Sequence, residues 1–211
     1  IKKTKPTLGI MADFGQIVCQ EILDIPKFGI INIHPSLLPR HRGASPIQGT
    51  ILSGDKNSGI TLMIAAAKMD AGPILTQTIV ELTQGETAST LKGYLAEIAA
   101  TALLNCIPYY LAGDFKPIEQ NEKLTTYTKI IKKDDGYVNL NTPAIEIERK
   151  IRAFDTWPKV YTKVDDKRIQ ILAAHFNEEK KLVIDRVKPE GKKEMNYEEY
   201  LRGYKKELNF K

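Results

Sequence analysis

Hydrophobic and polar positions follow two periods along the first half of the chain. Apolar runs predict strands at residues 6–11, 28–34, 59–64 and 74–80, and helical spacing predicts helices near residues 17–23, 45–53 and 87–112. A strand, a helix and a second strand within the first 35 residues form a βαβ unit, which builds parallel sheets. The pattern therefore predicts a buried first strand and an α/β domain with a parallel-type sheet over residues 1–115.

The pattern changes after residue 115. Residues 116–136 show no convincing periodicity and predict a basic linker. Beyond it, residues 142–154 have helical spacing, residues 160–164, 168–174 and 182–187 read as strands, and Asn196 with Glu199 predicts a capping box for a last helix. Short strands with flanking helices over residues 137–211 predict a small OB-like β-barrel, with Phe154 and Trp157 in its core.

The net charge of +5 lies entirely in the second half of the chain. Residues 1–115 hold 9 Lys and Arg and 9 Asp and Glu, whereas residues 116–211 hold 22 and 17. This asymmetry favours a polyanionic partner for the second half, with a solvated lysine-rich surface as an equally good alternative on composition.

Composition also limits the compartment and the chemistry. The two cysteines, Cys19 and Cys106, fall in helical patterns where we expect them to pack, and no Cys or His spacing matches a zinc site. No run of about 18 apolar residues occurs, so we expect no membrane span. We therefore expect a soluble, cytoplasmic protein without a metal.

Two polar residues interrupt the second predicted strand. Asn32 and His34 are two residues apart, so their side chains share a face at the carboxyl end of that strand. In α/β sheets ligands bind just beyond this end. A structural role, in which both side chains bond to loop backbone, is the alternative that these two residues leave open.

Two longer strings resemble the folate-dependent formyltransferases. The first runs from Asn32 to Pro39 and continues at Arg42-Gly43, and the second runs from Met69 to Ile74. That family transfers a formyl group from 10-formyltetrahydrofolate to an amine. The resemblance implies a partial Rossmann-like catalytic domain and the catalytic residues Asn32, His34 and Asp70. It also implies that a loop contacts the folate, formed by Ser36, Leu37, Leu38 and Pro39.

The chemistry gives each catalytic residue a role. An amine that attacks a formyl carbon creates a tetrahedral oxyanion, which preorganised donors stabilise. We expect the Asn32 amide and His34 to donate to this oxyanion, and His34 to pass a proton from the amine to the folate nitrogen. We expect Asp70 to orient His34 and to raise its affinity for the proton.

The second domain separates the possible acceptors. The family formylates glycinamide ribonucleotide, amino sugars on nucleotides, or methionine on initiator tRNA. Residues 127–136, 150–158 and 189–195 resemble the C-terminal part of the members that act on tRNA, which implies initiator methionyl-tRNA as the partner. A UDP-amino-sugar formyltransferase and a non-catalytic RNA-binding fragment are the alternatives. The basic residues then expected to contact phosphate are Arg40, Arg42, Lys129, Lys132, Lys133, Lys192 and Lys193.

The start of the chain also departs from the family. The family's first strand, turn and helix have no counterpart before Ile1, so we expect an N-terminal part to be absent. Open sheet edges and apolar surface would follow, and we expect this chain to be weakly active or inactive and prone to associate. The complete protein is expected to be a monomer.

Overall fold

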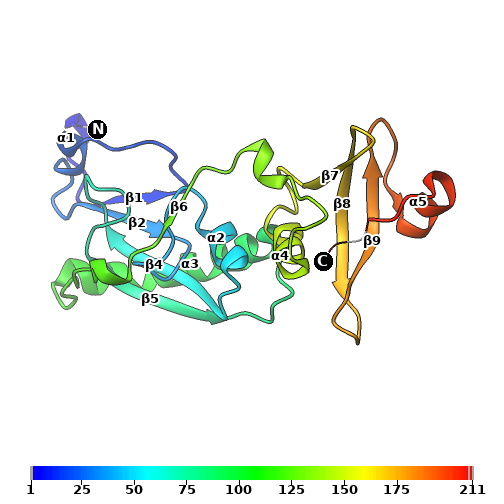
Figure 1. Cartoon of the computed structure of the whole chain (residues 1–211). Coiled ribbons are helices and arrows are strands. Elements are labelled where there is room, and N and C mark those ends of the chain that lie inside the picture. Colours follow the sequence, from blue (N-terminus) through cyan, green and yellow to red (C-terminus); the bar gives the residue numbers. More distant parts are fainter. Residues whose placement is uncertain (1, 209, 211) are drawn as a thin grey trace. The chain divides into compact units, whose positions relative to one another are not determined.

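The computed structural model shown in Figure 1 describes residues 2–208 and 210. It divides into two compact units. The first comprises Ile1–Thr50, Asp55–Gln84 and Thr90–Ile130, and the second comprises Ile51–Gly54, Gly85–Ser89 and Ile131–Lys211. The segment expected to be a linker, residues 116–136, therefore belongs to the first unit as far as Ile130.

Backbone pairing explains why this segment packs on the first unit. Its strand β6 (Tyr127–Thr128) pairs in parallel with β3 (Arg42–Gly43). Before it, Ile118 and Ile74 exchange two backbone hydrogen bonds of 2.8 Å. Two short 3-10 helices also lie in this segment: η2 (Glu122–Leu124) in the first unit and η3 (Lys133–Gly136) in the second. Such long-range pairing leaves no local periodicity in the sequence.

The main sheet of the first unit has the strand order β1-β2-β4-β5 and appears as blue to cyan arrows in Figure 1. Its strands are β1 (Gly9–Ala12), β2 (Ile30–His34), β4 (Asn57–Ile64) and β5 (Ile74–Glu81). β1 and β2 are parallel, as the βαβ pattern predicts, but β2–β4 and β4–β5 are antiparallel. The sheet is therefore mixed, because β5 returns directly from β4 through the loop of residues 65–73 without a crossover helix.

The prediction of a buried first strand is wrong. β1 is an edge strand, with β2 as its one neighbour in the described part of the sheet, and Ile10 is 46% exposed. The helix after it, α1 (Gln20–Leu23), has four residues, and Ile17 lies outside it in an exposed position. The 3-10 helix η1 (Lys2–Thr4) precedes β1. An apolar strand pattern does not tell an interior position in a sheet from an edge.

The core of the first unit lies around the two central strands. Ile31 of β2 and Leu62 of β4 are fully buried. The helices α2 (Pro46–Ser53) and α3 (Ala88–Ala112) occur where the spacing predicts them. α3 buries Leu91 and Leu95, and its end precedes a glycine at positive φ, as expected for a helix terminus.

The apolar character of α3 extends beyond its buried face. Within residues 2–208 and 210, α3 is the one helix long and apolar enough to cross a membrane by length and composition. Core helices of soluble proteins meet the same criterion. The absence of a membrane span therefore stays an expectation from sequence.

The second unit contains an antiparallel sheet with the order β10-β9-β8-β7. Its strands are β7 (Val160–Val164), β8 (Lys167–Phe176), β9 (Leu182–Pro189) and β10 (Met195–Asn196). In this order β10 and β7 are the outer strands, and Tyr137 forms a further, isolated parallel bridge with Tyr161 of β7. The antiparallel strands of the expected C-terminal β domain are therefore present.

The helices of the second unit follow the sequence prediction. α4 (Ala144–Ala153) buries Ile147 and Ile151, and α5 (Tyr197–Tyr204) begins at a capping box in which the Asn196 backbone N–H donates to Glu199 Oε2 over 3.1 Å. Phe154 is buried as expected, but Trp157 is 54% exposed, so its assignment to the core is wrong.

Candidate active site

Strand β2 places Asn32 and His34 in the interior at its carboxyl end. They lie opposite Met63 and Thr61 of β4 in the antiparallel register. Asn32 is 8% exposed and His34 is 4% exposed. The predicted arrangement, two polar side chains on one face of a buried strand, is therefore confirmed.

The His34 ring is held by the backbone of the following loop. Its Nε2 donates to the carbonyl oxygen of His41 over 3.0 Å. A carbonyl accepts only, so this bond assigns the proton of the neutral ring to Nε2 and leaves the lone pair on Nδ1. Nδ1 lies 3.7 Å from Oδ1 of Asp70, too far for a direct hydrogen bond.

Burial controls the charge of His34. Removal from water lowers the pKa of His34 below its ordinary 6.5, and the nearby Asp70 carboxylate opposes this with a smaller effect. The expectation that Asp70 raises the proton affinity of His34 is right for the direction of that one interaction. The expectation is wrong for the net change, because the pKa of His34 is lowered overall. The His34 ring is therefore neutral at pH 7.

Asp70 reaches the site from the loop between β4 and β5. Its Oδ2 accepts a hydrogen bond of 2.7 Å from the backbone N–H of Gly43. Its backbone is in the left-handed region, with φ of 49°. The two strings that carry the family resemblance therefore meet in space through Gly43, Asp70 and His34.

Asn32 is 8% exposed as a residue, and its side chain makes no hydrogen bond within the described part of the structure. Its amide atoms are not among the fully buried side-chain nitrogens and oxygens that lack a partner, so they keep access to water or to a ligand. The Asn32 amide is consequently an available donor next to His34 in the same strand.

Most of the predicted folate loop lies inside the protein. Ser36 is fully buried and donates through Oγ to the Arg40 carbonyl over 2.7 Å. Leu38 is 3% exposed, and its carbonyl accepts from Gln77 Nε2 over 2.9 Å. Leu37 and Pro39 are half-buried. Of the two leucines, Leu37 is the one that is accessible to a ligand.

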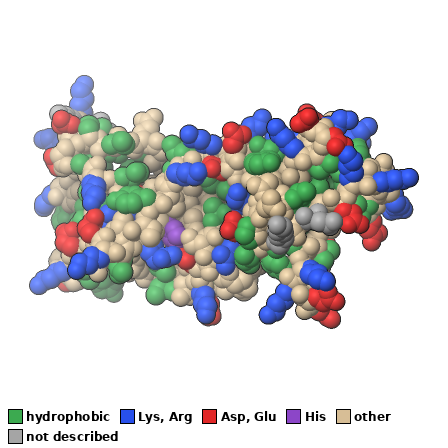
Figure 2. Space-filling model, in the orientation of Figure 1, with side chains coloured by type: hydrophobic (Ala, Val, Ile, Leu, Met, Phe, Trp, Pro, Cys, Tyr) green, Lys and Arg blue, Asp and Glu red, His purple; other side chains and the backbone are tan. Residues whose placement is uncertain are grey.

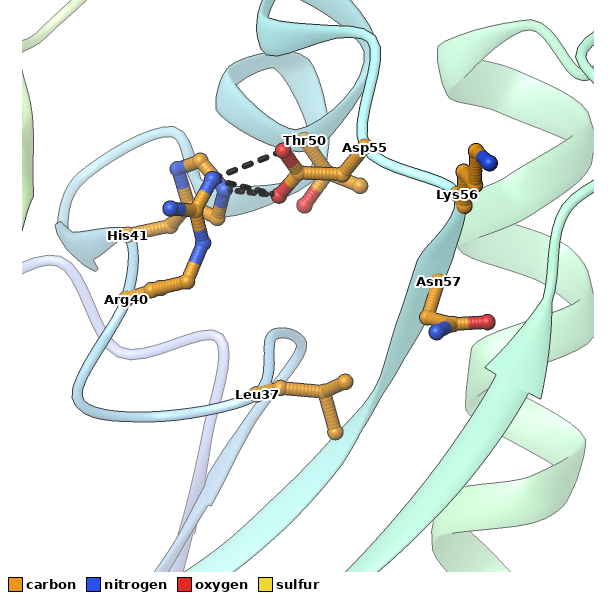
Figure 3. A pocket seen from close by; sticks show the side chains of 7 residues that line it. All are labelled: Leu37, Arg40, His41, Thr50, Asp55, Lys56 and Asn57. Carbon is orange, nitrogen blue, oxygen red and sulfur yellow. Dashed lines mark hydrogen bonds and ion pairs between the residues drawn. The ribbon is translucent and has the colours of Figure 1, made fainter.

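Leu37 lines a pocket of about 250 Å³ beside this loop. Figure 3 shows the Arg40 and His41 side chains turned toward Asp55 at one side of the pocket. Arg40 Nη2 lies 2.7 and 2.9 Å from the two Asp55 oxygens, and His41 Nε2 lies 2.8 Å from Oδ2. The pocket is lined by Leu37, Arg40, His41, Thr50, Asp55, Lys56 and Asn57. Arg40 remains half exposed despite its carboxylate partner.

Arg42 does not lie at the surface. Its side chain is fully buried, and its Nε and Nη2 donate to Gln120 Oε1 over 3.0 and 2.8 Å. Nη2 also donates to Glu122 Oε1 over 2.8 Å. The expected phosphate contact of Arg42 is therefore corrected: its guanidinium is sequestered by side chains of its own unit.

The other predicted phosphate-binding residues are exposed. Lys129 belongs to the first unit, and the remaining four to the second: Lys132, Lys133, Lys192 and Lys193. On the face shown in Figure 2, Lys and Arg side chains are interspersed with Asp and Glu side chains. The net positive charge therefore does not form a continuous basic surface on that face.

Several residues of the site carry no signal in the sequence. Thr61 Oγ1 accepts from the Leu38 N–H and donates to the Ser36 carbonyl, and Gln120 holds Arg42 from 78 positions away. Single polar residues at such separations have no spacing rule that would reveal them. Among the residues that the structure describes, no group of three or more His, Cys, Asp or Glu could hold a metal ion.

Glu122 gives a pH-dependent prediction for the Arg42 cluster. Hydrogen bonds from Arg42, then from Lys68, lower the pKa of Glu122 from 4.5 to about 2. A depressed carboxyl pKa stabilises the fold above pH 4.5 and loses that effect as the pH falls toward about 2. Denaturant titrations over this range should therefore show the stability difference between wild type and Glu122→Gln shrinking as pH falls. Glu119→Gln, a neighbouring exposed carboxyl outside the cluster, is the control for lost charge. A difference that stays constant with pH would contradict the role of Glu122.

Two family models match the chain. The Formyl transferase model matches residues 1–107, and the model for the Formyl transferase C-terminal domain matches residues 130–182.

Curated relatives extend the match across most of the chain. The methionyl-tRNA formyltransferase of Roseiflexus castenholzii is 40% identical over 176 residues, which is 83% of this chain and 56% of the relative. That of Chloroflexus aurantiacus is 42% identical over 158 residues, 75% of this chain and 51% of the relative. The chain spans about half the length of the curated relatives it matches.

Solved structures share the fold. The methionyl-tRNA formyltransferase from Clostridium thermocellum has a TM-score of 0.69 at 21% identity, covering 89% of this chain and 79% of that one. HypX from Aquifex aeolicus, in complex with tetrahydrofolic acid, has a TM-score of 0.72 at 19% identity, covering 98% and 40%.

The first family model includes the three predicted catalytic residues. Asn32, His34 and Asp70 lie within residues 1–107, and the second model begins at residue 130, where the first structural unit ends. Sequence, geometry and comparisons agree, and the chain belongs to the formyl transferase family.

Proposed function

We propose that the site formed by Asn32, His34 and Asp70 transfers the formyl group of 10-formyltetrahydrofolate to the amino group of initiator methionyl-tRNA. The carrying observation is the meeting of a neutral, buried histidine with a carboxylate and with an amide that has no hydrogen-bond partner among the described residues. Together these three groups can stabilise the oxyanion and carry the proton in acyl transfer to an amine, and no covalent enzyme intermediate is required. The names of the relatives at about 40% identity support methionyl-tRNA as the acceptor.

The geometry favours a division of labour between Asn32 and His34. Because His34 Nε2 already donates to the His41 carbonyl, the oxyanion is assigned to the Asn32 amide N–H. The amine nitrogen bonds to the formyl carbon and gives one proton to Nδ1 of His34. The bond from that carbon to the folate nitrogen then breaks, and the same proton passes to the folate nitrogen. Asp70, 3.7 Å from Nδ1, stabilises the transient imidazolium.

The folate is proposed to lie against the loop of residues 36–39. Leu37 and Pro39 are its half-buried side chains, so they offer apolar surface for a flat ring, while Ser36 and Leu38 fix the loop from inside. HypX, a neighbour in fold, has been solved with tetrahydrofolic acid, which agrees with a folate ligand for this fold.

The tRNA is proposed to contact exposed basic side chains. Arg40 and the lysines of both units remain candidates, whereas the buried Arg42 is not one. Phosphate contacts of this kind make affinity fall steeply with salt concentration. We also propose that the protein acts in the cytoplasm, where initiator tRNA is charged, and that the complete protein is a monomer.

A single-turnover assay tests this function. Purified chain in excess over methionyl-tRNA is mixed with 10-formyltetrahydrofolate, and formylmethionine released from the tRNA is measured. We expect the wild-type chain to formylate methionyl-tRNA, and the excess of enzyme makes even slow transfer visible. We expect this formylation to be lost in His34→Ala, because the proton carrier is removed. Transfer to a UDP-amino sugar in preference to methionyl-tRNA would assign the site to the other substrate class. Salt-sensitive tRNA binding without any transfer would leave a non-catalytic RNA-binding fragment.

A further inference from the structure

The side chain of Gln120 connects Arg42 with the loop that carries Asp70. Its Oε1 accepts from Arg42 Nε and Nη2 over 3.0 and 2.8 Å. Its Nε2 donates to the backbone carbonyls of Asp70 and Gly72 over 2.9 and 2.7 Å. Gln120 is 9% exposed, so these bonds form away from water.

The four bonds use the full capacity of a glutamine amide, which has one oxygen with two lone pairs and one nitrogen with two hydrogens. Arginine donates only and carbonyls accept only, so the partners fix which end of the amide is oxygen. No other side chain of this length offers two donors and two acceptor sites in one plane. Gln120 is therefore matched to this place by hydrogen-bond chemistry, in addition to its size.

The loop that Gln120 contacts carries strain at the catalytic carboxylate. Asp70 has φ of 49°, in the left-handed region that residues other than glycine rarely adopt. Such a conformation persists only where surrounding contacts determine it. The carbonyl that Gln120 binds is that of Asp70 itself.

Further contacts hold the same loop to the same segment. Glu122 pairs with Lys68 of the loop and with Arg42, each over 2.8 Å. The backbone bridge between Ile74 and Ile118 closes the end of the loop. These contacts fix the loop as a whole, and only Gln120 among them grips the backbone at Asp70.

We propose that Gln120 is a positioning residue that holds the loop of residues 65–73 so that the Asp70 carboxylate stays beside His34 and the Gly43 N–H. The inference deepens the proposed function and rests on it. Gln120 does not touch the reacting atoms. It acts by fixing the position of the Asp70 carboxylate. A displacement of a catalytic group by about 1 Å is enough to lower the rate about 100-fold.

Titration of His34 tests the proposal without any substrate. The chain has three histidines, so ¹⁵N-histidine spectra resolve His34 from His41 and His175. The groups that act on His34 are Asp70, which raises its pKa, and the His41 carbonyl and ring, which raise and lower it respectively. In Gln120→Met, Asp70 loses its anchor, so the His34 pKa should fall further, toward its value in Asp70→Asn. The His175 signal comes from the second unit and is the internal reference for the spectra.

Kinetics provide the second readout. We expect kcat for formyl transfer to fall about 10- to 100-fold in Gln120→Met. KM for either substrate should be unchanged, because the interaction lost matters mainly in the transition state. Gln48→Met, a half-buried glutamine of α2 outside these contacts, is the matched control and should behave as wild type. Gln120→Glu keeps the acceptor for Arg42 and loses both donors, so it should show the same two effects if Gln120→Met folds poorly.

The outcomes separate this inference from the proposed function. If both Gln120 variants keep the wild-type His34 pKa while Asp70→Asn changes it, the positioning role is overturned. If wild type transfers no formyl group but the His34 pKa falls in the Gln120 variants, the positioning role stands and the proposed reaction fails.

Discussion

Asn32→Ala is expected to lower kcat for formyl transfer about 100- to 1,000-fold, the usual effect of losing one oxyanion donor. The fold should survive, because the Asn32 side chain has no hydrogen-bond partner within the described residues and its removal strands no other group. The removed interaction forms only in the transition state, so KM should change little. Steady-state kinetics with a thermal unfolding curve for the same sample measure both effects.

Asn105→Ala, an exposed asparagine on α3, is the control for Asn32→Ala and should keep wild-type turnover. His34→Ala is expected to reduce kcat through loss of the proton carrier, by about 100- to 10,000-fold. An Asn32→Ala protein that folds and turns over at the wild-type rate would remove the amide from the mechanism.

Gly72→Ala is expected to destabilise the fold and to reduce formyl transfer together. A Cβ at position 72 would lie 1.8 Å from the carbonyl oxygen of Ile64, the last residue of β4. A backbone atom cannot move aside as a flexible side chain does, so the loop that carries Asp70 must shift. Overpacking of this kind costs about 1–3 kcal/mol, and the shift displaces the carboxylate from His34. Denaturant unfolding and kcat should both report the change.

Gly93→Ala is the matched control for Gly72→Ala. Gly93 lies inside α3, and a Cβ there meets nothing within 4 Å. Alanine favours a helix over glycine by about 1 kcal/mol, so this variant should be slightly more stable than wild type and fully active. If Gly72→Ala behaved like Gly93→Ala, the close approach of Gly72 to β4 would have no functional meaning.

The sequence predicts those elements whose burial follows a local period. β2 and α3 occur where their apolar patterns place them, since each buries one continuous face or run. The place of Asn32 and His34 follows from the two-residue period of β2. By contrast, the exposure of β1 depends on which strand lies beside it, and the chain order alone does not contain that information.

Electrostatic balance is the second limit of the sequence. A carboxylate near a histidine predicts a raised pKa, but His34 is buried deeply enough that desolvation outweighs Asp70. Arg42 shows the same limit, since an arginine in a loop predicts a phosphate contact until Gln120 and Glu122 are known to enclose it. Both errors concern how much water a charged group retains, which is a property of the assembled unit.

The pairing of β6 with β3 also decides where this protein can be divided. Thr126 accepts through Oγ1 from the His41 N–H and through its carbonyl from the Arg42 N–H, each over 2.9 Å. The backbone that orients His34 is thus completed by residues that come after α3. A minimal catalytic module cut at residue 115 would discard this support together with Gln120. Chimaeras that exchange the C-terminal unit with other formyl transferases have their natural junction after Ile130.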